Sequence, residues 1–119
     1  MRILYAEDDP QLRESLRIAA ERRRLDYVTV SDAAEAWKLI LAGERFDVII
    51  SDNDMPDMSG IELLRLVRSK PETKDTHFIL YSGNDFEGVF TEAKSLGAIH
   101  VDKATVRVPS LLAKHLPRS

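Results

Sequence analysis

Short apolar runs and longer segments of mixed residues alternate along this chain. Four of the runs are apolar almost throughout, at residues 3–6, 48–50, 78–81 and 98–101. Runs of this length and composition are typical of strands that are buried on both faces of a parallel sheet. Residues 27–30, with the sequence Tyr-Val-Thr-Val, form a fifth run that we interpret as a short strand.

The segments between the runs carry apolar residues at helical spacing, and helix signals stand at their ends. Asp9 and Pro10 are typical of a helix start, and Ser31 or Asp32 is suited to cap the next helix. Glycine and proline mark where helices end. Five helices are predicted. The first begins at Pro10, the second runs from the Ser31 or Asp32 cap to Gly43, and the third runs from Gly60 to Pro71. The fourth carries Phe86, Val89, Phe90, Ala93 and Leu96, and the fifth extends from about Pro109 to Leu116.

Five strands that alternate strictly with five helices, over a single domain at residues 1–119, predict an α/β fold. Right-handed crossovers and the buried character of strands one, three, four and five favour a doubly wound parallel sheet of the flavodoxin-like type. The expected strand order is 2-1-3-4-5. In that order residues 27–30 form an edge strand, and the first and third strands are neighbours.

Composition narrows the possible functions. The chain has no cysteine, which excludes cysteine nucleophiles and cysteine-based zinc sites. Its 17 basic and 20 acidic side chains give a net charge of −3, so electrostatics provide no reason to expect nucleic-acid binding. No apolar stretch approaches membrane-spanning length and no signal peptide is visible, so we expect a cytoplasmic protein without a membrane segment.

Chemically active residues stand where the apolar runs stop. Glu7 and Asp8 follow the first run, Asp52 follows the central one, and Ser82 and Lys103 follow the last two. Since the carboxyl ends of parallel strands meet at one edge of a sheet, we expect these side chains to converge. Carboxylates that lie so close need a cation, and all-oxygen ligation suits Mg²⁺. Asp52 is then the best-placed nucleophile toward phosphorus, with Lys103 and Ser82 contacting the phosphoryl oxygens.

Together with residues 46–60, which read FDVIISDNDMPDMSG, these residues resemble the response-regulator receiver domain of two-component and phosphorelay signalling. The resemblance covers essentially the whole chain. It implies that Asp52 accepts a phosphoryl group from a sensor histidine kinase or a histidine phosphotransfer protein. It also implies Mg²⁺ as the cofactor, with Asp8 as a direct ligand, Glu7 acting largely through water, and Asp54 contributing its backbone carbonyl.

The same resemblance assigns roles to residues around the phosphate. Ser82 resembles the switch hydroxyl and Lys103 the phosphate-binding lysine, while His100 stands where receivers carry a switch side chain that follows that hydroxyl. Asp54 and Asn84 occupy the positions that tune hydrolysis of the acyl phosphate. The family implies a signalling phosphoacceptor, not an enzyme, which catalyses its own phosphorylation and dephosphorylation. Phosphorylation would switch a surface that binds a downstream protein, in a monomer or a phosphorylation-dependent dimer.

One departure from the family pattern concerns the position of Lys103. The next residue is Ala104, where receivers usually have a proline with a cis bond before it. A cis bond to a residue other than proline costs about 2.5–4 kcal/mol. We therefore expect either a strained loop or a trans bond with a rearranged lysine.

Two alternative functions stay open at the level of the sequence. A pseudo-receiver would keep the fold as an interaction module that is never phosphorylated, which Ala104 leaves open although the complete acidic set opposes it. A haloacid-dehalogenase-like phosphatase would use Asp52 and Asp54 as an Asp-x-Asp pair. Those enzymes carry that pair after the first strand and usually have a cap insertion, for which 119 residues leave no room.

Overall fold

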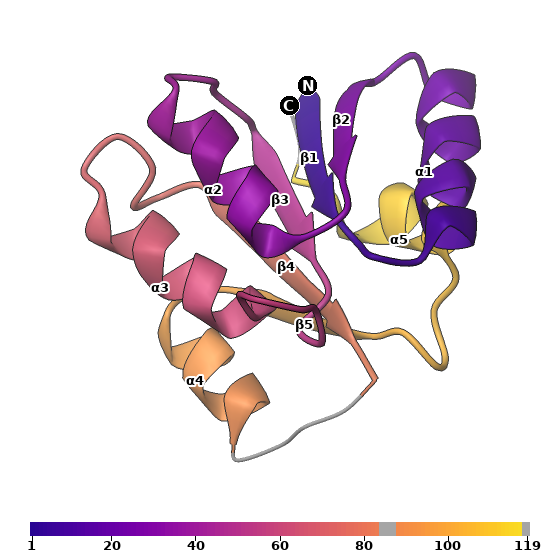
Figure 1. Cartoon of the computed structure of the whole chain (residues 1–119). Coiled ribbons are helices and arrows are strands. Elements are labelled where there is room, and N and C mark those ends of the chain that lie inside the picture. Colours follow the sequence, from indigo (N-terminus) through magenta and orange to yellow (C-terminus); the bar gives the residue numbers. More distant parts are fainter. Residues whose placement is uncertain (84–87, 118–119) are drawn as a thin grey trace.

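The computed structural model describes residues 1–83 and 88–117, and its five strands form one parallel sheet (Figure 1). The strand order is β2-β1-β3-β4-β5, which confirms the predicted topology and the α/β fold. The strands are β1 (Arg2–Ala6), β2 (Asp26–Val30), β3 (Val48–Ser51), β4 (His77–Ser82) and β5 (Ile99–Asp102).

The helices that the described residues form cover both faces of the sheet. In Figure 1, α1 and α5 lie on one side and α2, α3 and α4 on the other. Phe86, predicted for the fourth helix, lies outside the described residues. The longest described helix has 13 residues, and none of those described is long and apolar enough to cross a membrane. The helices are α1 (Pro10–Arg22), α2 (Ala33–Leu41), α3 (Gly60–Ser69), α4 (Val89–Ser95) and α5 (Val108–His115).

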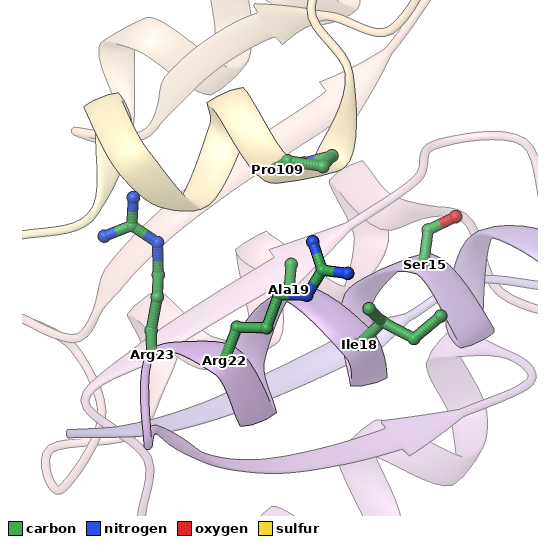
Figure 2. A pocket seen from close by; sticks show the side chains of 6 residues that line it. All are labelled: Ser15, Ile18, Ala19, Arg22, Arg23 and Pro109. Atoms are coloured by element: carbon green, nitrogen blue, oxygen red, sulfur yellow. The ribbon is translucent and has the colours of Figure 1, made fainter.

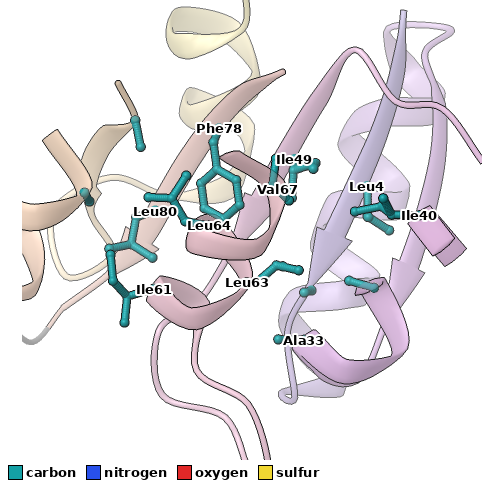
Figure 3. Close-up of a cluster of buried hydrophobic side chains, with 14 residues drawn as sticks. Leu4, Ala33, Ile40, Ile49, Ile61, Leu63, Leu64, Val67, Phe78 and Leu80 are labelled. Carbon is teal, nitrogen blue, oxygen red and sulfur yellow. The ribbon is translucent and has the colours of Figure 1, made fainter. Parts of the chain in front are cut away.

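The alternation of side chains along each strand divides the core into two layers. In β1, Ile3 and Tyr5 pack with the layer of α1 and α5, whereas Leu4 and Ala6 pack with the layer of α2, α3 and α4. Figure 3 shows the second layer, where side chains of the sheet such as Phe78 meet those of α3. Because β1, β3 and β4 are covered on both faces, their apolar side chains are almost fully buried up to the edge where the polar residues begin.

The predicted helix caps are confirmed. Asp9 precedes α1 and its carboxylate accepts a hydrogen bond from the backbone N–H of Gln11 at 2.9 Å. Of the two candidates for the second helix, Asp32 is the cap, and it accepts from the backbone N–H of Glu35 at 2.7 Å. Such bonds satisfy amides that the first turn of a helix leaves without partners. The carboxylate of Asp9 is therefore engaged at the start of α1, as its sequence position predicted.

The prediction that the fifth strand is buried on both faces was wrong for most of its length. In β5, Val101 is buried, but Ile99 is 38% exposed and His100 is half-buried. The reason is topological, because the order β2-β1-β3-β4-β5 leaves β5 at the sheet edge with one neighbouring strand. Strand β2, at the opposite edge, is half-buried or exposed throughout, as expected of an edge strand.

Candidate functional site

Three carboxylates converge where β1 and β3 end. The two strands are paired in register, with Ala6 opposite Ser51, so Glu7 and Asp52 leave the sheet side by side. The backbone N–H of Asp52 also donates to the carbonyl of Ala6 at 3.1 Å, which holds the strand ends together. Carboxylate oxygens of Glu7, Asp8 and Asp52 lie within 4.8 Å of one another. The predicted convergence of the acidic residues is therefore confirmed.

Lys103 joins this cluster from the loop after β5. Its ammonium donates to Oε1 of Glu7 at 2.5 Å and to Oδ2 of Asp52 at 2.9 Å. The bond between Lys103 and Ala104 is trans, and the backbone N–H of Ala104 donates to the carboxylate of Asp102 at 2.9 Å. Of the two expected alternatives, a strained loop with a cis bond or a loop with a trans bond, the structure shows the trans bond. The lysine reaches the carboxylates without the cis bond that is usual in the family pattern.

Burial and charge act in opposite directions on Glu7 and Lys103. Glu7 is fully buried, and burial raises the pKa of its carboxyl, although hydrogen bonds from Lys103 and from the backbone N–H of Asp9 partly offset that effect. Burial also lowers the pKa of Lys103, but its hydrogen bonds to Glu7 and Asp52 outweigh burial and raise that pKa above the ordinary value. The ammonium therefore stays charged at neutral pH and neutralises part of the acidic cluster.

The structure adds one residue to the site that the sequence analysis missed. Tyr5 is fully buried in β1, and its hydroxyl donates to Oε1 of Glu7 at 3.4 Å. Burial, and then the negative charge of Glu7, raise the pKa of this phenol, so it stays protonated and can donate. Within an apolar run, Tyr5 looked like core. The available signal was its spacing, because residues two apart in a strand share a face, and Glu7 follows Tyr5 by two.

Ser82 is the last residue of β4, and His100 is the second residue of β5, where it pairs with Leu80. Ser82 is fully buried, and its backbone carbonyl accepts hydrogen bonds from Nε2 of His100 at 3.1 Å and from the backbone N–H of Lys103 at 3.4 Å. The ring of His100 also stacks on that of Phe90 in α4, with 3.4 Å between their centroids. These contacts connect the end of β4 with α4. The switch roles of Ser82 and His100 stay predictions.

The two residues predicted to tune hydrolysis are placed differently. Asp54 is exposed, and its backbone N–H donates to Oδ1 of Asp52 at 3.4 Å. This bond and that from Lys103 therefore engage both carboxylate oxygens of Asp52. Asn84 lies outside the described residues. The tuning roles, and the use of the Asp54 carbonyl as a metal ligand, stay predictions.

The donor set of the cluster fits a hard divalent cation. Oxygen atoms of three carboxylates converge, and Mg²⁺ and Ca²⁺ prefer such ligands to nitrogen or sulfur. Asp8 is exposed while Glu7 and Asp52 are buried, so the cluster faces solvent on the side of Asp8. That exposure leaves room for the waters that Mg²⁺ usually retains.

Two hollows on the surface help to locate the site. One, of about 430 Å³, lies between α1 and α5 and is lined by residues that include Ile18, Arg22 and Pro109 (Figure 2). The other, of about 600 Å³, is lined by Lys103 and by Tyr81 and Arg107 among others. The carboxylates of the cluster line neither hollow, and the second one adjoins it through Lys103. The acidic cluster with Lys103, and not the hollow between the helices, is therefore the candidate functional site.

Comparison with known proteins shows the family of the chain. Residues 3–106 match the family described as response regulator receiver domain. The response regulator protein FleR of Pseudomonas aeruginosa is 42% identical over 69 residues, which are 58% of this chain but 14% of FleR. The solved structure of the chemotaxis response regulator CheY4 of Vibrio cholerae has a TM-score of 0.81 and 27% identity, over 94% of this chain and 92% of that one. The response regulator TrrA of Thermotoga maritima, solved in complex with Mg²⁺-BeF, has a TM-score of 0.72 and 28% identity, over 87% of each chain.

Proposed function

The chain belongs to the response regulator receiver domain family, and on that premise we propose that Asp52 is the residue that accepts the phosphoryl group. The observation that carries the proposal is the placement of the ammonium of Lys103 within hydrogen-bonding distance of Asp52, beside the carboxylates of Glu7 and Asp8. A nucleophilic carboxylate, a fixed cation and an acidic metal-binding set are the parts that phosphoryl transfer to aspartate requires.

The proposed reaction transfers a phosphoryl group from a phosphorylated imidazole of a donor protein. A carboxylate oxygen of Asp52 forms a bond to phosphorus, and the phosphorus–nitrogen bond breaks, leaving its electron pair on the imidazole. Lys103 would then donate to an oxygen of the bound phosphoryl group, since an ammonium has three donors and two of them now contact carboxylates. Attack of water on the acyl phosphate would release inorganic phosphate and restore Asp52.

Magnesium is the proposed cofactor. Asp8, Glu7 and Asp52 would hold the ion, together with the backbone carbonyl of Asp54, and the bound ion would neutralise charge on the phosphoryl oxygens. The support is the all-oxygen donor set of this chain and the complex of TrrA with Mg²⁺-BeF.

The proposed partners follow from the family. A sensor histidine kinase or a histidine phosphotransfer protein would supply the phosphoryl group, and a cytoplasmic downstream protein would read the phosphorylated state. The matched residues are only 14% of FleR, so these partners are proposed for this chain and are not taken from that relative. Neither alternative function is favoured. The acidic residues and Lys103 lie together, which argues against a pseudo-receiver. Asp52 follows the central strand and not the first, which argues against a phosphatase of the haloacid-dehalogenase type.

Phosphoryl uptake by the wild-type chain tests the proposed function. With Mg²⁺ and acetyl phosphate, we expect the intact mass to increase by one phosphoryl group, and peptide mapping to place that group on Asp52. With Mg²⁺ and beryllofluoride, we expect amide signals around the ends of β1, β3 and β4 to shift. A chain whose mass and spectrum both stay unchanged would not be a phosphoacceptor.

Mg²⁺ binding is tested separately through thermal stability. A ligand that binds the folded state at one hundred times its Kd stabilises it by about 2.7 kcal/mol, so Mg²⁺ should raise Tm by several degrees. Asp8→Asn should remove most of this increase. Asp9→Asn is the matched control, since it makes the same charge change next door and asparagine caps a helix as well as aspartate does. Equal increases in wild type and Asp8→Asn would contradict the assignment of Asp8 as a ligand.

A further inference from the structure

A tyrosine hydroxyl lies beneath the acidic cluster, inside the protein. Tyr5 and Glu7 are both fully buried, and the hydroxyl donates to Oε1 of Glu7. A buried hydroxyl and a buried carboxylate both need hydrogen-bond partners, because each loses its contacts with water. The pair is therefore a fixed element of the site, set by the backbone of β1.

The same oxygen of Glu7 has a second donor, which stands at the end of a long side chain. Oε1 accepts from the ammonium of Lys103 at 2.5 Å, and Oε2 accepts from the backbone N–H of Asp9 at 3.1 Å. Lys103 sits at the end of a flexible side chain and also contacts Asp52 at 2.9 Å. Tyr5, by contrast, is held by the surrounding core and can move little.

Phosphorylation of Asp52 gives Lys103 new acceptors but leaves Glu7 buried. A phosphoryl group on Asp52 brings new anionic oxygens, which attract the ammonium away from its present contacts. Oε1 of Glu7 would then lose the nearer of its two donors, and a buried carboxylate oxygen without a hydrogen bond is unfavourable. A donor that stays in place on Oε1 reduces the cost of that movement.

We propose that Tyr5 is a positioning residue for phosphoryl transfer: its hydroxyl holds the carboxylate of Glu7 when Lys103 turns toward the phosphoryl group on Asp52. This inference rests on the proposed function, because it assumes that Asp52 is the phosphoacceptor. It assigns to β1 a task beyond carrying the metal-binding residues at its end. The ring of Tyr5 packs in the core, and the hydroxyl alone takes part in the site.

Tyr5→Phe tests the proposal, with Tyr81→Phe as the matched control. Tyr81 is also a buried tyrosine on the same layer of the core, but its hydroxyl donates to the backbone carbonyl of Val106 instead of Glu7. Both variants remove one hydroxyl and keep the ring. At saturating Mg²⁺, we expect Tyr5→Phe to weaken beryllofluoride binding about three- to tenfold, because a bond as long as 3.4 Å contributes about as much as an ordinary hydrogen bond. Tyr81→Phe should bind beryllofluoride as the wild type does.

The free energy of unfolding is measured for both variants, to separate a structural role from a positioning role. If Tyr5 has only a structural role, both variants should be less stable than the wild type and should bind beryllofluoride with the wild-type affinity. That result would overturn the proposal. If Tyr5→Phe does not fold, a fluorinated tyrosine placed at position 5 replaces it. Fluorine makes the phenol a stronger donor, so beryllofluoride affinity should rise, and an unchanged or lower affinity would overturn the proposal.

The outcomes also distinguish this inference from the proposed function. A wild-type chain that does not respond to Mg²⁺ and beryllofluoride would contradict the function itself. A wild-type chain that responds, together with a Tyr5→Phe variant of unchanged affinity, would contradict the role of Tyr5 alone.

Discussion

Replacing Asp52 with asparagine is expected to abolish phosphoryl uptake and to leave the fold intact. The amide has nearly the shape of the carboxylate but is a poor nucleophile. Among the described residues, the other carboxylate that bonds to Lys103 is that of Glu7, which is fully buried. We expect the initial rate of uptake from acetyl phosphate with Mg²⁺ to fall at least about a thousandfold, which corresponds to roughly 4 kcal/mol in activation free energy. Intact mass measured over time gives this rate.

Asp54→Asn is the control for this variant. It makes the same change of charge two residues away, at an exposed position whose backbone N–H donates to Asp52. Asp54→Asn should still take up one phosphoryl group, with a changed lifetime of the acyl phosphate. If Asp52→Asn retains uptake at a rate close to that of wild type, the phosphoacceptor is a different residue.

Gly60→Ala is expected to damage both stability and the site. A Cβ added at Gly60, the first residue of α3, would lie 2.3 Å from the carbonyl oxygen of Asp52 and 2.9 Å from Cδ1 of Leu80. The first of these neighbours is backbone, so α3 or the strand end must move. Overpacking of this kind typically costs about 1–3 kcal/mol and occasionally more. Urea unfolding should show that loss, and beryllofluoride affinity should fall because Asp52 is displaced.

Gly83→Ala provides the comparison, since a Cβ there meets no atom of the described residues within 4 Å. Its free energy of unfolding should equal that of the wild type or exceed it slightly, because alanine has less freedom than glycine in the unfolded chain. Equal stability of Gly60→Ala and the wild type would mean that α3 does not need its close approach to Asp52.

The parts of the fold that the sequence predicted correctly depend on local rules and on topology. Asp9 was predicted as a cap from its residue type and from Pro10 next to it, and the structure confirms it. The convergence of Glu7, Asp8 and Asp52 followed from strand order alone, since neighbouring parallel strands end at the same edge. Neither prediction required knowledge of how side chains pack.

The features that sequence reasoning missed depend on contacts between distant segments. The exposure of Ile99 results from the edge position of β5, which the predicted strand order implied although the apolar run indicated a buried strand. The close approach of Gly60 to Asp52 depends on how α3 packs on the sheet. The contact of Lys103 with Asp52 depends on the path of the loop after β5. Tyr5 was missed because an aromatic residue in an apolar run is ordinarily core, and its hydroxyl is noticed once Glu7 is seen to be buried beside it.

If the proposed function holds, the two layers of the core have different tasks, one in phosphoryl uptake and one in partner binding. Tyr5 packs in the layer of α1 and α5, whereas His100 turns to the opposite side of the sheet and stacks on Phe90 of α4. In the proposed function, a change that starts at Asp52 and reaches α4 would therefore pass from the end of β3 to the opposite layer, through Ser82 and His100. Substitutions in the α1–α5 layer would then change phosphoryl uptake, and substitutions around α4 would change the binding of the downstream protein.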